Sequence, residues 1–123
     1  MTKGDIMIDG MTLDMHNNKI WFMNDEIHRE DGPAIETVDG DELWYLNGLR
    51  HRVDGPAIDR LDGTMGWYLH GKLHREDGPA KIDSAGSVWW YLNGKLHREG
   101  GPAVVHPDGS KLWYYHGEEL PQE

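Results

Sequence analysis

The sequence contains no cysteine, a single phenylalanine and no long apolar run. The absence of cysteine excludes disulfides, thiolate metal sites and a cysteine nucleophile. No segment approaches the ~18 apolar residues of a membrane span, and the N-terminus lacks the apolar core of a signal peptide, so we expect a cytoplasmic protein without a membrane partner. Basic residues are also scarce, 12 against 22 acidic ones, for a formal net charge of −10. This charge opposes direct binding to nucleic acid and favours a partner with a basic surface.

What the 123 residues do contain is a repeat with a period of 23. Tryptophan keeps this interval at Trp21, Trp44, Trp67, Trp90 and Trp113. Histidine keeps it at His28, His51, His74 and His97, and Gly-Pro-Ala triplets follow at 32–34, 55–57, 78–80 and 101–103. The pattern predicts a single repeat domain over 1–123. Its parts are a degenerate N-terminal half-unit (1–19), four full units (20–42, 43–65, 66–88 and 89–111) and a partial C-terminal unit (112–123).

Each unit is typical of short strands, because Gly and Pro recur too often for a helix. Leu43–Leu46 is rich in strand formers, and Asn47-Gly48 is a strong hairpin signal before the return of 49–52. A further strand over 57–61 turns at Asp62-Gly63 into the next unit. The sequence therefore predicts an all-β fold. We expect an elongated single-sheet antiparallel meander, or solenoid, with about two strands per repeat.

The unit reads approximately W-Y-L-N-G-K-L-H-R-E-D-G-P-A, followed by a short variable strand and D-G. This pattern resembles the MORN repeat family, in the variant found in phage and giant-virus arrays with antitoxin-like relatives. The resemblance covers residues 20–117 and implies an elongated sheet used for contacts rather than one particular activity. Ordinary MORN units carry G-x-G where this chain has Asp-Gly-Pro, so the lipid binding of some MORN proteins is not carried over.

Alternation along the strands places Trp44 and Leu46 on one face and Leu43 and Tyr45 on the other. We expect the Trp row on the inner, buried face, since it never varies. The other row reads Phe22, Tyr45, Tyr68, Tyr91 and Tyr114. These tyrosines are either packing residues or a contact surface, because Tyr is enriched at interfaces.

The His-Arg pairs of the repeat invite a catalytic or metal-binding interpretation, which geometry opposes. Equivalent residues two strands apart are separated by roughly 9–10 Å, too far for shared metal coordination. The unit also offers no nucleophile. We therefore expect no catalytic residue, no metal and no cofactor, and a structural role for His28, His51, His74, His97, Arg29, Arg52, Arg75 and Arg98. The first three arginines should pair with Asp31, Asp54 and Asp77, whereas Arg98 needs another partner because Gly100 replaces the Asp.

Net charge is not repeated along the chain. Unit 20–42 carries one basic and eight acidic residues, the tail 112–123 carries three glutamates, and the units between are close to neutral. The acidic end is a candidate partner-binding site, comprising Asp25, Glu26, Glu30, Glu36, Asp39, Asp41 and Glu42. A solvated cap on a solenoid is the alternative interpretation.

These observations favour a non-enzymatic protein-binding scaffold. The phage-type resemblance implies a small acidic inhibitor, or antitoxin-like neutraliser, of a host or defence protein such as a nuclease. Two alternatives remain open: a module that binds a glycan or peptide along the Tyr row, and a structural protein that forms homo-oligomers through its edge strands.

Overall fold

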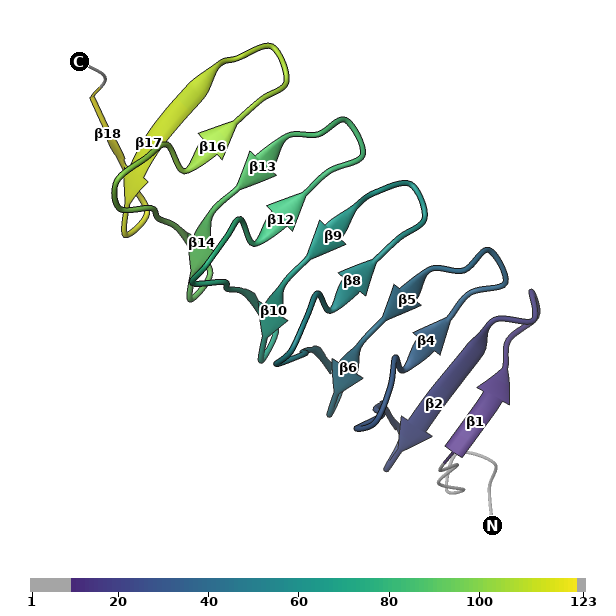
Figure 1. Ribbon diagram of the computed structural model, residues 1–123. Coiled ribbons are helices and arrows are strands. Elements are labelled where there is room, and N and C mark those ends of the chain that lie inside the picture. Colours follow the sequence, from purple (N-terminus) through teal and green to yellow (C-terminus); the bar gives the residue numbers. More distant parts are fainter. Residues whose placement is uncertain (1–9, 122–123) are drawn as a thin grey trace.

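The computed structural model describes residues 10–121, and the expectations for residues 1–9 and 122–123 lie outside the described part. Residues 10–121 contain no helix, and most of their strands form one antiparallel sheet of 12 strands in meander order. Figure 1 shows this sheet as an elongated single layer with the two termini at opposite ends. The predicted all-β, elongated meander is confirmed.

The described residues form eighteen strands. They are β1 (Gly10–Leu13), β2 (Lys19–Met23), β3 (Glu26–Ile27), β4 (Ile35–Glu36), β5 (Glu42–Leu43), β6 (Tyr45–Leu46), β7 (Leu49–Arg50), β8 (Ile58–Asp59), β9 (Met65–Gly66), β10 (Tyr68–Leu69), β11 (Lys72–Leu73), β12 (Lys81–Ile82), β13 (Val88–Trp89), β14 (Tyr91–Leu92), β15 (Lys95–Leu96), β16 (Val104–Val105), β17 (Lys111–Tyr115) and β18 (Glu118–Leu120).

The main sheet gains two strands with each step of the repeat, for example β8 and β9 followed by β12 and β13. The turn between β8 and β9 contains the predicted Asp62-Gly63, where Gly63 has a φ of +95° and its amide donates to the carbonyl of Arg60. A side chain is strained at this φ, which explains the glycine. Asn17, with a φ of 68°, occupies the corresponding position in the degenerate half-unit.

The second element of each unit is a tight hairpin. Tyr45 pairs with Arg50 and Leu46 with Leu49, around Asn47 and Gly48, whose φ values of 51° and 80° are both positive. Two central residues with positive φ give the turn that matches the twist of a hairpin. The hairpin predicted at Asn47-Gly48 is confirmed.

Strand lengths differ from the expectation. The segment predicted as one strand, 43–46, is split at Trp44 into the end of β5 and the start of β6, while 49–52 and 57–61 shorten to β7 and β8. The reason is a change of partner. Before Trp44 the chain pairs with β4 and β8 of the main sheet, and after it the chain pairs with β7 of its own hairpin.

Backbone hydrogen bonds join each repeat to the next at equivalent atoms. The amide of Arg52 donates to the carbonyl of Tyr68 at 3.0 Å, and the amide of Gly71 donates to that of Arg50 at 2.8 Å. Arg75 bonds to Tyr91 in the same way as Arg52 bonds to Tyr68. The hairpins are therefore stacked on one another as well as attached to the main sheet.

The most buried side chains are not the tryptophans. Those of the Trp row are half-buried, which corrects the expected burial of that face. The buried positions that recur with the repeat are the alanines of the Gly-Pro-Ala triplets, Ala34, Ala57, Ala80 and Ala103, each 0% exposed. Val104, which follows the last of these alanines, is 2% exposed. The backbones of the alanines are held on both sides: Ala80 accepts the amide of Trp67 at 2.7 Å and donates to the carbonyl of Trp89 at 2.8 Å. A single-layer sheet has room at these points for a methyl group only.

Candidate functional site

In each of the four full units, the tryptophan of the Trp row has an arginine stacked on its ring. The guanidinium carbon of Arg52 lies 3.9 Å from the ring centroid of Trp44, and Arg75 lies at the same distance from Trp67. Arg29 on Trp21 and Arg98 on Trp90 repeat the contact. The arginine follows its tryptophan by eight residues, so the loop after each hairpin folds back over the indole. A cation over an indole face is favourable, which explains why Trp keeps its interval.

The glycine of each Gly-Pro-Ala triplet lies close against the guanidinium. A Cβ atom at Gly78 would lie 2.7 Å from the Cζ of Arg75, and one at Gly55 would lie 2.9 Å from that of Arg52. Glycine is therefore required here because the arginine approaches its backbone closely, and not because its φ is positive. Tryptophan, arginine and glycine therefore pack together in each full repeat.

The predicted Arg–Asp pairs are present. Nε of Arg52 donates to Oδ1 of Asp54 at 2.9 Å, while Nη1 donates to the carbonyl of Pro56. Arg29–Asp31 and Arg75–Asp77 have the same geometry. Where Asp is missing, Arg98 relies on Trp90 and on the carbonyl of Pro102. The hydrogen bond and charge of Arg52 hold the pKa of Asp54 below its ordinary value, so this carboxylate stays charged.

The repeat histidines lie at the junctions between hairpins. Nδ1 of His28 accepts the amide of Asn47 at 2.8 Å, and Nδ1 of His74 accepts that of Asn93 at 2.9 Å. On its other side, Nε2 of His28 lies 3.4 Å from Oε2 of Glu30. Within residues 10–121, no group of three or more His, Asp or Glu side chains is arranged to hold a metal ion.

His51 differs from the other repeat histidines because Val53 stands where they have a glutamate. Burial, and then the neighbouring ring of His70 at 4.4 Å, lower the pKa of His51. At pH values below the ordinary pKa of 6.5, His51 therefore binds a proton more readily in the unfolded chain than in the folded one. We expect the free energy of unfolding to decrease as the pH is lowered below 6.5, and to decrease less in the His51→Asn variant. Denaturant unfolding at about pH 7.5 and 5.5 measures this difference, and equal losses in both proteins would contradict it.

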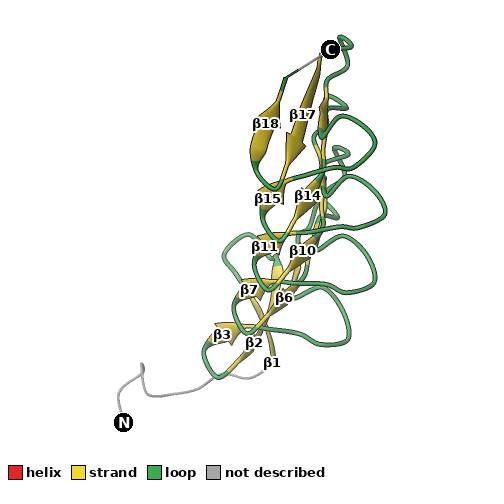
Figure 2. Cartoon of the chain, turned by 90° about the vertical axis from the view of Figure 1, so that its left-hand side faces the viewer, coloured by secondary structure: helices red, strands yellow, loops and turns green. Residues whose placement is uncertain are grey.

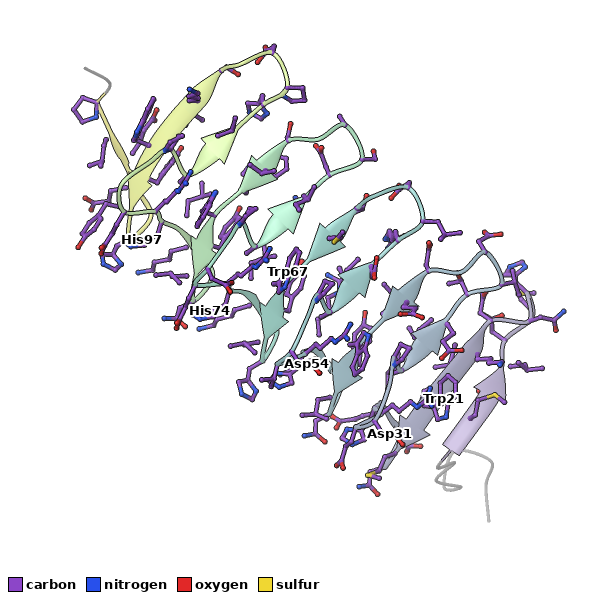
Figure 3. The ribbon with its side chains drawn as sticks, in the orientation of Figure 1. Trp21, Asp31, Asp54, Trp67, His74 and His97 are labelled. Atoms are coloured by element: carbon purple, nitrogen blue, oxygen red, sulfur yellow. The ribbon has the colours of Figure 1, made fainter. Side chains whose placement is uncertain are left out.

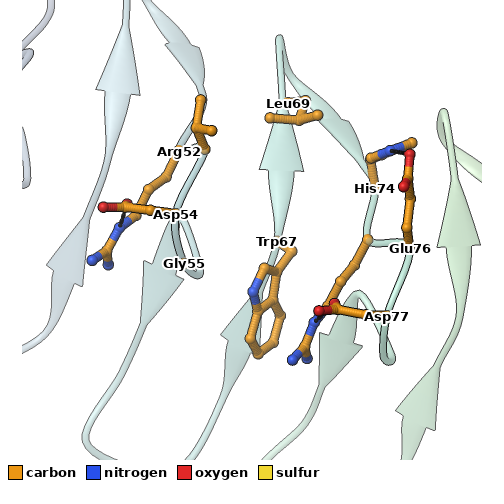
Figure 4. Close-up of a pocket in the computed structure, with 10 residues that line it drawn as sticks. Arg52, Asp54, Gly55, Trp67, Leu69, His74, Glu76 and Asp77 are labelled. Atoms are coloured by element: carbon orange, nitrogen blue, oxygen red, sulfur yellow. Dashed lines mark hydrogen bonds and ion pairs between the residues drawn. The ribbon is translucent and has the colours of Figure 1, made fainter.

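A groove opens beside each stacked tryptophan. The largest, about 660 Å³, is lined by Arg52 and Asp54 of one loop, Asp77 of the next, and Trp67 and Leu69 between them. Figure 4 shows Trp67 and Leu69 as the floor, with Asp54 and Asp77 on either side. Equivalent grooves of about 570 and 370 Å³ have Trp44 with Leu46, and Trp90 with Leu92. A fourth, of about 330 Å³, includes Trp21 and Met23. The predicted sharing of one face by Trp44 and Leu46 is confirmed.

These grooves lie in a row on one side of the molecule. Figure 2 shows the loops that follow β7, β11 and β15 projecting one after another from the sheet, and Figure 3 shows Asp31 and Asp54 on successive repeats. We call these four grooves the groove row.

Charge in the groove row is unevenly exposed. The side chain of Arg52 is 22% exposed, whereas that of Asp54 is 80% exposed. Arg75 and Asp77 differ in the same way, at 27% and 90%. The cations are enclosed by Trp and Gly, and the carboxylates face solvent. An incoming molecule therefore meets an apolar floor between acidic walls.

The acidic residues of the first unit do not form one patch. Asp25 and Glu26 lie at the turn of the β2–β3 hairpin, and Asp39 lies in the β4–β5 turn. Figure 1 places these two turns at opposite long edges of the sheet. Among the seven candidates, only Glu30 lines the groove row.

Three further acids of this unit lie in or beside the main sheet. Glu36 contacts Nη1 of Arg29 at 3.3 Å, and Asp41 accepts the amide of Leu61 at 2.9 Å. Glu42, which is exposed, stands opposite Glu36 in the β4–β5 ladder. Two of these three carboxylates therefore already have partners within the chain.

The Tyr row forms part of the stacked hairpins. Tyr45, Tyr68, Tyr91 and Tyr114 are all half-buried. Burial, followed by the charges of Tyr68 and Tyr114, raises the pKa of Tyr91. The guanidinium of Arg50 lies over the ring of Tyr68 at 5.4 Å.

Sequence reasoning did not identify the groove row. Its signal was present in the fixed interval of eight residues from Trp to Arg and three from Arg to Gly, but a stacking contact has no spacing rule comparable to that of a helix or strand.

Within residues 10–121, no helix is long and apolar enough to cross a membrane. No family model matches the chain, and neither a curated protein nor a solved structure matches it.

Proposed function

We propose that this protein is a non-enzymatic scaffold that binds the basic surface of another protein through the groove row. The observation that carries the proposal is the contrast between enclosed arginines and exposed aspartates beside an apolar floor. Lysine and arginine side chains fit this arrangement, because their aliphatic stems pack on apolar surface while their charged heads remain near carboxylates.

The net charge of −10 supports the same class of partner, since it steers basic proteins toward the chain and repels phosphates. Basic surfaces are the parts of proteins that contact nucleic acid. Covering one would block a nucleic-acid-handling enzyme such as a nuclease, which is the inhibitory role that the antitoxin-like resemblance implies. The MORN resemblance itself stays a prediction.

The test compares two variants with the same change of charge. Asp31→Asn, Asp54→Asn and Asp77→Asn together remove three exposed carboxylates from the groove row and keep an acceptor for the arginine that each aspartate pairs with. Asp25→Asn, Asp39→Asn and Glu42→Gln together neutralise exposed acids of the first unit outside it. A binding protein is first captured from a lysate and identified, and its association is then measured by surface plasmon resonance.

We expect the groove variant to bind about tenfold more weakly, with a slower association rate whose deficit shrinks as salt is raised. The first-unit variant should retain most of the affinity. Equal weakening in both variants would assign recognition to the overall charge, and unchanged binding in the groove variant would remove the groove row from the function.

A further inference from the structure

The grooves recur with the same chemistry at a fixed spacing. Each consists of a tryptophan, the residue two positions later on the same face, and an acidic loop on either side, with Trp44, Trp67 and Trp90 as the three central floors. Because the main sheet gains two strands per repeat, consecutive floors are separated by about 9.6 Å, twice the distance between neighbouring strands.

This spacing distinguishes between the conformations of a bound segment. In a β-strand, side chains on one side recur every ~6.7 Å, which does not match the grooves. In an α-helix, equivalent side chains two turns apart are separated by about 10.5 Å. A polyproline-II helix has three residues per turn and a rise of 3.1 Å, so every third side chain points the same way at intervals of about 9.3 Å. The polyproline-II period is the closest to the groove spacing.

The floor and walls specify the side chain. Aromatic floors suit polyproline-II segments, which are ordered before they bind and lose little entropy. The exposed carboxylates of Asp31, Asp54 and Asp77 specify a cation at the mouths of the Trp21, Trp44 and Trp67 grooves. In the Trp90 groove, the exposed carboxylates of Glu76 and Glu99 take their place. The groove row thus combines one apolar contact and one charge contact at each step.

We propose that the partner segment is a polyproline-II stretch with Lys or Arg at every third position, lying along the groove row with one basic side chain in each groove. This inference rests on the proposed function, because it names the part of the basic partner that is recognised. The segment runs along the long axis of the sheet, from the loop of Asp31 to that of Glu99.

The test uses two fluorescent peptides of identical composition, each with four lysines and eight prolines. One has Lys at every third position, and the other has its lysines consecutive at one end. Both have the same net charge, so nonspecific attraction to an acidic protein is equal. Affinities are measured by fluorescence anisotropy for the unmodified protein and for the groove and first-unit variants, whose folding is checked by circular dichroism.

We expect the evenly spaced peptide to bind at least about tenfold more tightly than the clustered one, because linked contacts act together only when their spacing matches. This preference should disappear in the groove variant and persist in the first-unit variant. A titration of the unmodified protein followed by its tryptophan fluorescence should give the same affinity as the anisotropy measurement, since tryptophans form the groove floors.

Equal affinity for the two peptides would overturn the inference, and so would a preference that survives in the groove variant. If the groove variant weakened both peptides equally, the grooves would still bind basic segments. The polyproline-II spacing would then be wrong while the proposed function stood. The proposed function itself is tested separately, by the binding of the identified partner protein to the groove and first-unit variants, and not by these peptides.

Discussion

Replacing Trp67 by alanine should lower the free energy of unfolding by about 3–5 kcal/mol, the range for truncation of a large packed aromatic residue. The ring is half-buried, but it supports the guanidinium of Arg75 at 3.9 Å. Its loss would free that arginine and the loop that Asp77 and Pro79 help to hold. Denaturant unfolding followed by circular dichroism measures the change, because the remaining tryptophans complicate a fluorescence signal.

Trp113 provides the matched control. The position eight residues after it is Pro121, whereas the other units have the stacking arginine there. Trp113→Ala should therefore be clearly milder than Trp67→Ala. A loss of the same size at both positions would mean that the stacked arginine adds nothing to the stability of the repeat.

The second large effect is expected from adding volume at a buried alanine. Ala80→Leu should destabilise the protein by about 3 kcal/mol, at the upper end of ordinary overpacking. Ala80 is fully buried, and its amide and carbonyl groups are both bonded to neighbouring strands, so the backbone has little freedom to move away. Thermal and denaturant unfolding should both report the loss.

Ala85→Leu makes the same change on an exposed turn. It should alter stability by no more than about 0.5 kcal/mol, as is usual for surface substitutions. If Ala80→Leu were equally well tolerated, there would be unfilled space around the buried alanines of the Gly-Pro-Ala triplets. The inference that each repeat is tightly packed at this position would then be wrong.

Local signals in the sequence predicted local structure correctly. Asn47-Gly48 and Asp62-Gly63 specify turns through the backbone freedom of their own residues, and Arg52 pairs with Asp54 only two residues away. The 23-residue phase then predicted that these elements recur in an antiparallel meander. Each of these inferences needs only neighbours in sequence.

The groove row and the buried alanines depend on where distant segments meet. Arg52 stacks on Trp44 only because the loop folds back after the hairpin, and the strand break at Trp44 follows from a change of pairing partner. Ala57 has a small side chain that contributes little to any hydrophobic pattern, yet it is fully buried. The invariance of the Trp row therefore directed attention to it as the buried face, when it forms the floor of exposed grooves.

The one-layer meander also determines how the protein would respond to force. The two ends of the described chain lie at opposite ends of the sheet, so tension applied there runs across the strands (Figure 1). Adjacent central strands are joined by ladders of two residues, such as Lys81–Ile82 with Val88–Trp89. Tension would open such ladders one after another, as in a zipper, instead of shearing many at once. Because each repeat contacts mainly its neighbours, the array would lengthen in small, similar steps and behave as a compliant molecular spring.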